Sequence, residues 1–316
     1  MRNKYIKIAI PYNKIIDILK NQKFKRIIFY MDLQSIAKGL YQKNNIFFEI
    51  NYYINNGKPS KQLLIEYKNL LNRIYKICKF YSPFFITFYD DGINQQNTTI
   101  SSNYKGGRST FSDFLENDDD IKLFKKIKKN YFLQIEQYFN KPNLSKVYYL
   151  KEYESDLIPY YVIKNDLFNS KQPTTLNVIL SNDKDLLQTC KFKNTIQVTN
   201  RFFPSKLGKK QLGMDIYNNK TAIQYIYKNF KIGNLTAEYI PLLLSLIGDK
   251  ADKILGLKGV GPAKAIKLIE TYDLPPEIYE LKQHSNLPKI ISENLDLIIQ
   301  NYQLISFDEQ LQRTSI

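Results

Sequence analysis

The sequence predicts a mixed α/β fold built on a parallel sheet, and two observations support this prediction. Three runs rich in β-branched and aromatic residues have the character of strands: RIIFYMD (26–32), FFITFYDD (84–91) and LNVILSNDKD (176–185). The segments between them, such as 61–80 and 158–167, have apolar residues at helical spacing. Near-continuous apolar strands that alternate with helices are typical of a parallel sheet covered on both faces.

Each predicted strand ends in acidic residues. A fourth short strand, KVYYL (146–150), leads into a segment that supplies two more acids. The strand-end acids are Asp32, Asp90 or Asp91, Glu154 with Asp156, and Asp183 with Asp185. Because ligands gather at the carboxyl ends of parallel strands, we expect these side chains at one edge of the sheet.

The next element in the chain is a basic helix. After an acidic patch at 118–120, residues 121–139 predict a basic amphipathic helix. Its lysines are Lys122, Lys125, Lys126, Lys128 and Lys129. The segment RFFPSKLGKKQLG (201–213) predicts a basic hairpin or loop, and helical segments follow. We therefore place a domain boundary near residue 200, which gives domains of 1–200 and 201–316.

A glycine-rich connection, GLKGVGPAKA (256–265), precedes one of these helices. Gly259 and Gly261 allow a tight turn, Pro262 suits the first position of a helix, and Lys264 falls in the first turn. The exposed amides of such a helix start can bind a phosphate. It is not a P-loop, because proline follows Gly261 where lysine would be needed. A glycine-rich connection without a ligand is the alternative interpretation.

The charge balance points to a polyanionic partner. Lys and Arg number 46 against 30 Asp and Glu, which gives a formal charge of +16, and the isoelectric point is near 9.4. Such a surplus attracts nucleic acid over several ångströms. The alternative is a lysine-rich solvated surface that reflects an AT-rich genome.

Cysteine and histidine are too scarce for zinc sites or histidine-dependent triads. The chain has two cysteines, which are far apart, and one histidine, so any metal must be held by oxygen. The longest apolar stretch, 239–247, is about half of what spans a bilayer. We expect a soluble cytoplasmic protein that is neither secreted nor bound to a membrane.

The acids predict a site for divalent cations. Asp249 and Asp252 add to the carboxylates at the strand ends, and clustering so many like charges is costly unless Mg²⁺ or Mn²⁺ neutralises them. A phosphodiesterase that uses two metal ions needs such a cluster of carboxylate ligands. Taken singly, each of these acids has a commoner role as a turn or N-cap residue, so the prediction rests on the joint pattern.

Five segments together resemble the 5′ nuclease superfamily, which includes flap endonucleases and the 5′-exonuclease domains of bacterial DNA polymerases. The segments are FYMDLQSIAKGLY, NYKGGR, EYESD, VILSNDKDLLQ and LIGDKADKILGLKGVGPAKAIKLI. They keep the order of the family over residues 26–269 and are closest to the bacteriophage ribonuclease H type. The resemblance implies a PIN-like nuclease core with a helical arch at about 109–142, followed by a helix-three-turn-helix DNA-binding region.

The resemblance also implies roles for individual residues. The metal ligands would be Asp32, Asp90, Glu154, Asp156, Asp183, Asp185, Asp249 and Asp252, with Asp91 in reserve for Asp90. Lys105 and Arg108 would approach the scissile phosphate, where negative charge grows during displacement. The lysines at 122–129 would cover a single-stranded 5′ end. The helix-three-turn-helix, including Gly259, Gly261 and Lys264, would grip the duplex backbone, with a potassium ion in its loop.

The function implied is Mg²⁺-dependent hydrolysis, with two ions, of 5′ ends or flaps of DNA and of RNA primers in RNA·DNA hybrids. The chain would act in replication as a monomer, in contact with replication proteins, in a cell or a phage-infected host. The alternatives are a non-catalytic duplex-binding protein that retains the fold, and a PIN-type ribonuclease. One departure from bacterial and phage members is Leu157, which stands where they place a further acid. If Leu157 faces the site, we expect loose binding of one metal. The alternative is that Leu157 packs a helix into the core.

Overall fold

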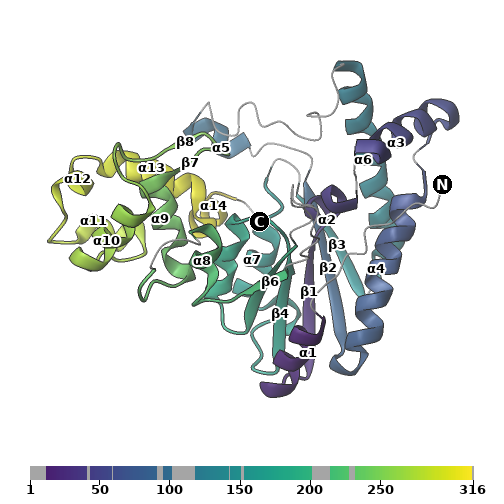
Figure 1. Ribbon diagram of the computed structural model, residues 1–316, viewed down its shortest axis with the longest axis horizontal. Helices are drawn as coiled ribbons and strands as arrows, with labels where there is room; N and C mark the ends of the chain where they lie inside the picture. Colours follow the sequence, from purple (N-terminus) through teal and green to yellow (C-terminus); the bar gives the residue numbers. More distant parts are fainter. Residues whose placement is uncertain are drawn as a thin grey trace, which may run out of the picture.

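The computed structural model describes residues 12–40, 43–58, 60–90, 95–101, 118–141, 143–150, 153–200, 214–227 and 232–314. Among these residues, a mainly parallel sheet has the strand order β3-β2-β1-β4-β5-β6 (Figure 1). Its strands are β1 (Arg26–Asp32), β2 (Pro83–Asp90), β3 (Ser145–Leu150), β4 (Thr175–Leu180), β5 (Thr195–Asn200) and β6 (Met214–Tyr217). β6 is antiparallel to β5, whereas the other neighbouring pairs are parallel. The predicted fold class is confirmed.

The central strand β1 is buried on both faces, as its apolar sequence predicts. Ile27 and Phe29 belong to the core on one face, while Ile28 and Tyr30 belong to the core on the other. This alternation follows from the period of two along a strand. Two helical layers therefore cover the sheet.

The first layer consists of helices from the N-terminal half, and Figure 1 shows three of them, α3, α4 and α6, together on one side of the sheet. Its helices are α1 (Tyr12–Asn21), α3 (Lys43–Asn56), α4 (Gln62–Cys78) and α6 (Asp118–Phe139). Two short elements join them to the strands: α2 (Leu33–Leu40) follows β1, and the 3₁₀ helix η1 (Lys79–Tyr81) precedes β2. A third, α5 (Gln95–Ile100), follows β2 in the sequence but contacts the C-terminal helices, where Gln300 Nε2 donates to the Ile100 carbonyl at 2.9 Å. α6 is the predicted amphipathic helix: Ile127 and Tyr131 are buried, whereas Lys122 and Lys126 are exposed.

The second layer packs α7 (Leu157–Lys164), the 3₁₀ helix η4 (Asp185–Lys191) and α14 (Phe307–Arg313) on the opposite face. Another 3₁₀ helix, η3 (Leu167–Asn169), follows α7. Asp308 ties α14 to the other two elements: its carboxylate accepts hydrogen bonds from Lys164 at 2.5 Å and Lys191 at 2.6 Å, and also from the Tyr160 hydroxyl. We call these four residues the Asp308 cluster.

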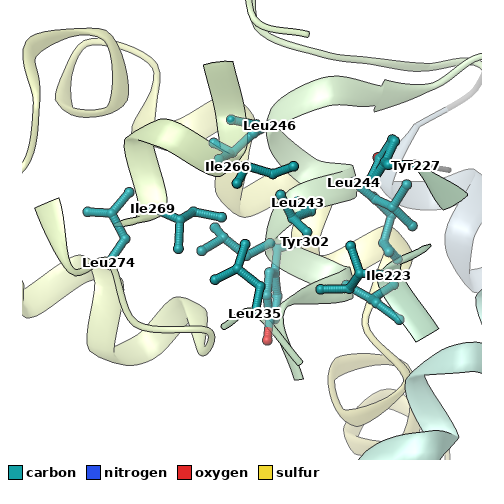
Figure 2. Packing of buried hydrophobic residues seen from close by; sticks show 14 of the residues in the cluster. Ile223, Tyr227, Leu235, Leu243, Leu244, Leu246, Ile266, Ile269, Leu274 and Tyr302 are labelled. Carbon is teal, nitrogen blue, oxygen red and sulfur yellow. The ribbon is translucent and has the colours of Figure 1, made fainter. Parts of the chain in front are cut away.

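A second hydrophobic core lies in the C-terminal helices. These are α8 (Ala222–Ile226), the 3₁₀ helix η5 (Ala237–Tyr239), α9 (Ile240–Ile247), α10 (Pro262–Tyr272), α11 (Ile278–Gln283), α12 (Lys289–Ser292) and α13 (Leu295–Ile305). Figure 2 shows Leu246 of α9 beside Ile266 of α10, and Leu244 on the side of Tyr227. A helix that is apolar all round must be buried on all sides, so the other helices pack around α9.

The glycine-rich connection forms the predicted turn and helix start. Gly259 has φ +72°, Gly261 is the N-cap, and α10 begins at Pro262. Proline suits this first position because its missing N–H would have no helical partner there. In the described part of the chain, every helix is too short or too polar to cross a membrane.

Candidate metal centre at the carboxyl edge of the sheet

Asp32 is the last residue of β1, and hydrogen bonds fix its carboxylate. The Ser35 N–H donates to Oδ1 at 2.9 Å, and the Ser35 hydroxyl donates to Oδ2 at 2.5 Å. Ser181, which directly follows the neighbouring strand β4, donates its hydroxyl to the same Oδ2. Burial raises the pKa of Asp32, the serine hydrogen bonds lower it, and the charge of Asp183 raises it again. Asp32 thus caps the start of α2 and also lies beside the next strand-end acid.

The loop after β4 is held in place by its own polar groups. The Asp183 N–H donates to Ser181 Oγ at 3.0 Å, and the Asp185 N–H donates to Asp183 Oδ1 at 3.0 Å. Gln197 of β5 donates through Nε2 to the carbonyls of Ser181 at 3.2 Å and Asp183 at 2.6 Å. These bonds fix the turn that presents Asp183 and Asp185.

Gln197 is a supporting residue that sequence reasoning missed. It is fully buried in a strand of otherwise apolar or β-branched residues, TIQVT. A buried amide needs hydrogen-bond partners, so a glutamine at an inward position of a predicted core strand was the available signal. The sequence of the strand, however, does not indicate that its partners are the carbonyls of Ser181 and Asp183.

A tight hairpin positions the two acids from the C-terminal region. β7 (Gly248–Asp249) pairs with β8 (Ile254–Leu255). Gly248 has φ +82°, and a Cβ there would lie 2.3 Å from the backbone nitrogen of Gly256, so only glycine fits. The Ala251 N–H donates to Asp249 Oδ1 at 3.0 Å. Asp249 and Asp252 are both buried in this turn.

The loop after β4 and the hairpin bring three carboxylates together. Ligand oxygens of Asp185, Asp249 and Asp252 all lie within 4.8 Å of one another. Burial raises the pKa of Asp185 well above its ordinary value, and the charges of Asp183, Asp252 and Asp249 raise it further, while Lys184 lowers it. Like charges this close favour a cation between them. An all-oxygen donor set fits a hard divalent ion such as Mg²⁺.

One lysine lies within this group of acids. The Lys184 ammonium forms an ion pair with Asp249 Oδ2. Burial lowers the pKa of Lys184, but the neighbouring acids outweigh burial and raise its pKa above the ordinary value. We call Lys184, Asp185, Asp249 and Asp252 the acidic cluster.

Known proteins share both the sequence pattern and the architecture. No family model matches the sequence. The chain is 33% identical over 141 residues to a 5′-3′ exonuclease of Mycoplasma genitalium, covering 45% of this chain and 41% of that protein. It is 29% identical over 144 residues to DNA polymerase I of Borreliella burgdorferi, covering 43% of this chain and 13% of that protein. The matches thus span less than half of the length of either relative.

Solved structures extend the likeness over most of the chain. The bacteriophage T5 flap endonuclease in a complex with DNA and metal ions has a TM-score of 0.60 at 16% identity, covering 89% of each chain. The T5 5′-exonuclease with bound zinc has a TM-score of 0.59 at 16% identity, covering 90% of each chain. The chain has the 5′ nuclease fold.

The predicted ligands from the ends of β2 and β3 are not part of the acidic cluster. Glu154 is buried just after β3, and Asp156 is at the N-cap position of α7; both belong to the same edge of the sheet. They do not belong to the group of three carboxylates found among the described residues. Asp90 ends β2, but its side chain and the whole of Asp91 lie outside the described residues.

The predicted contacts to nucleic acid are described only in part. Lys105, Arg108 and residues 109–117 at the start of the predicted arch lie outside the described residues, as do the side chains of Lys125 and Lys128. Lys122, Lys126 and Lys129 are exposed on α6. At the start of α10, Gly259, Gly261 and Lys264 are exposed as well.

Leu157 packs in the core, which is the second of the two alternatives for this residue, so the condition for loose metal binding is not met. Leu157 has no exposed surface, and it packs in the core beneath the sheet with Tyr160, Ile163 and Phe307. It is the first residue of α7, and its apolar side chain belongs to the same hydrophobic core as Ile28 and Tyr30 of β1. The departure from related sequences at this position is therefore a packing feature, and it gives no reason to expect loose metal binding.

Proposed function

We propose that this chain is a divalent-metal-dependent 5′ nuclease that hydrolyses phosphodiesters at 5′ ends and flaps of DNA. The observation that carries the proposal is the meeting of Asp185, Asp249 and Asp252 within 4.8 Å inside a 5′ nuclease fold. These acids come from two segments about 60 residues apart, and two of them are buried despite their charge. Such an arrangement is costly for a protein that does not bind a cation.

We propose that the acids hold two Mg²⁺ ions, for which Mn²⁺ can substitute. Asp185, Asp249 and Asp252 would hold one ion. The second set would be Asp32, Asp90, Glu154, Asp156 and Asp183. Ions bound there supply positive charge and Lewis acidity to a phosphodiester and to an attacking water.

Other residues of the chain would bind and orient the substrate. Lys105 and Arg108 would contact the scissile phosphate and stabilise the charge that grows on it. The α6 lysines at 122–129 would attract a single-stranded 5′ end. The amides at Gly259 and Gly261, together with Lys264, would bind the duplex backbone as a helix start binds phosphate, with a potassium ion in the loop.

The relatives and the charge support a proposal for the substrate and the cellular setting. One relative is a 5′-3′ exonuclease, another is a DNA polymerase I, and a structural neighbour is a flap endonuclease bound to DNA. With a net charge of +16, the chain would bind DNA and RNA·DNA hybrids mainly through their backbones. We propose primer removal and flap processing in replication, by a monomer with a nuclease core at 1–200 and a DNA-binding helical region at 201–316.

A cleavage assay tests this function. Labelled 5′-flap, nicked-duplex and RNA·DNA hybrid substrates are incubated with Mg²⁺ or with EDTA. We expect Mg²⁺-dependent cleavage, and a loss of at least about 100-fold in Asp183→Asn, because removing a charged ligand costs several kcal/mol of transition-state stabilisation. Asp296→Asn, on the exposed face of α13, is the matched control and should keep full activity. Cleavage in EDTA, or full turnover in a well-folded Asp183→Asn, would contradict the proposal.

A further inference from the structure

The acidic cluster contains its own cation. Lys184 lies between two of the proposed ligands, Asp183 and Asp185, yet its ammonium reaches across to Asp249 in the C-terminal hairpin. The Lys184 side chain is 27% exposed, whereas that of Asp249 is 5% exposed. The lysine is therefore the more exposed partner of the pair.

Both oxygens of Asp249 are engaged. Oδ1 accepts the Ala251 N–H at 3.0 Å, and Oδ2 pairs with Lys184. The first bond belongs to the fixed turn of the hairpin, while the second ends on a long side chain. A divalent ion that takes Oδ2 as a ligand would meet the Lys184 ammonium at the same oxygen, where the two positive charges repel each other.

We propose that Lys184 is an exchangeable counter-cation of the metal centre, an inference that rests on the proposed function. It neutralises Asp249 when no divalent ion is bound, and it withdraws toward solvent when one binds. Lysine suits this role because its charge is compact and strongly hydrated and its four-carbon stem is flexible. Lys184 thus has two opposite effects: it stabilises the metal-free protein, and it lowers the affinity of the protein for Mg²⁺.

The chain offers a matched control at the other end of the same 3₁₀ helix. Lys191 is 21% exposed and also pairs with one aspartate, Asp308. Asp308 lies in the second helical layer, where it has two further donors in Lys164 and Tyr160. Lys191→Met therefore removes a similar ion pair without touching the acidic cluster.

The experiment measures metal binding directly on the full chain without DNA. Mn²⁺ binding is followed by electron paramagnetic resonance and Mg²⁺ binding by calorimetry, for the wild type, Lys184→Met, Lys184→Arg and Lys191→Met. We expect roughly tenfold tighter binding in Lys184→Met, the order expected for removing one unit charge near a divalent ion. Lys184→Arg and Lys191→Met should stay within about twofold of the wild type, since both keep the charge in the cluster.

Thermal melts supply a second signature. In EDTA, both methionine variants should melt below the wild type, because each leaves an aspartate with fewer partners. Saturating Mn²⁺ should restore more of the lost stability in Lys184→Met than in Lys191→Met. If Lys184→Met does not fold, Lys184→Gln is measured in its place.

The outcomes separate this inference from the proposed function. If the wild type binds Mn²⁺ and Lys184→Met binds it equally or more weakly, Lys184 is a fixed structural link or aids binding, and the inference is overturned while the nuclease proposal stands. If the wild type binds neither ion, the proposed metal centre itself fails.

Discussion

Two clusters in this molecule use aspartate and lysine in opposite proportions. The acidic cluster has three carboxylates around Lys184, and the Asp308 cluster has two ammonium groups and a phenol around one carboxylate. η4 lies between them, with Asp185 at one end and Lys191 at the other. The same residue types thus form, within one short helix, a site with excess negative charge and a site in which the charge is matched.

The pKa values of the two aspartates differ in direction for this reason. Burial raises the pKa of both, but hydrogen bonds from Lys164, Lys191 and Tyr160 outweigh it at Asp308 and lower its pKa to about 2. At Asp185, the neighbouring acids add to the effect of burial, and Lys184 offsets only part of it. The ratio of carboxylates to ammonium groups therefore distinguishes the proposed cation site from a structural ion pair, since both contain acids.

The largest expected effect comes from Asp185→Asn. We expect cleavage to fall by at least about 100-fold, because a proposed metal ligand is lost. In EDTA, however, the variant should melt above the wild type, because the ionised carboxylate is disfavoured in the folded state. A cleavage assay and a melt in EDTA test both parts. A lower melting temperature would contradict the view that the acids repel one another.

Asp308→Asn should have the opposite profile. We expect a loss of about 2 kcal/mol in the free energy of unfolding, the usual worth of charge-assisted hydrogen bonds at a partly buried group. Cleavage should be retained, since Asp308 pairs with Lys191 at the end of η4 opposite to Asp185. Urea unfolding measures the loss, with Glu309→Gln on the same helix as the control. Equal stability of the two variants would show that the Asp308 cluster does not stabilise the fold.

The smallest effect is a pH dependence confined to acid. Because the pKa of Asp308 is lowered to about 2, its stabilisation is fully present above the unfolded pKa of roughly 3.9 and is lost as the pH falls toward 2. Between about pH 5 and pH 3, the wild type should lose about 1 kcal/mol more unfolding free energy than Asp308→Asn. Urea titrations in EDTA at these two pH values measure the difference. Parallel losses would assign the acid sensitivity to other carboxylates.

Local patterns predicted the fold well, because they depend on neighbours in the sequence. β1 covers the predicted 26–32, and α10 starts at the predicted Pro262. The acids at the strand ends were expected at one edge because parallel strands share a direction, and Asp32, Asp183 and Asp185 follow this rule.

The parts that sequence missed depend on contacts between distant segments. Gln197 acts through a loop of another strand, and Lys184 reaches Asp249, 65 positions away. Leu157 follows two acids, yet the first turn of α7 directs it into the core. Sequence spacing alone does not tell which side of a helix start faces a site, because this depends on how the helix packs on the sheet.

The hairpin of Gly248 and Gly256 has a consequence for how the chain folds during synthesis. Asp185 and the sheet precede it, and the hairpin is held by the helices of the second core. A growing chain that has formed only the sheet presents Asp32, Asp183 and Asp185 without the two acids of the hairpin. The contacts between the loop after β4 and the hairpin, such as that of Lys184 with Asp249, join residues far apart in the sequence. Such contacts form slowly compared with local helices. We therefore expect the proposed metal centre to be complete only after the C-terminal helices have formed.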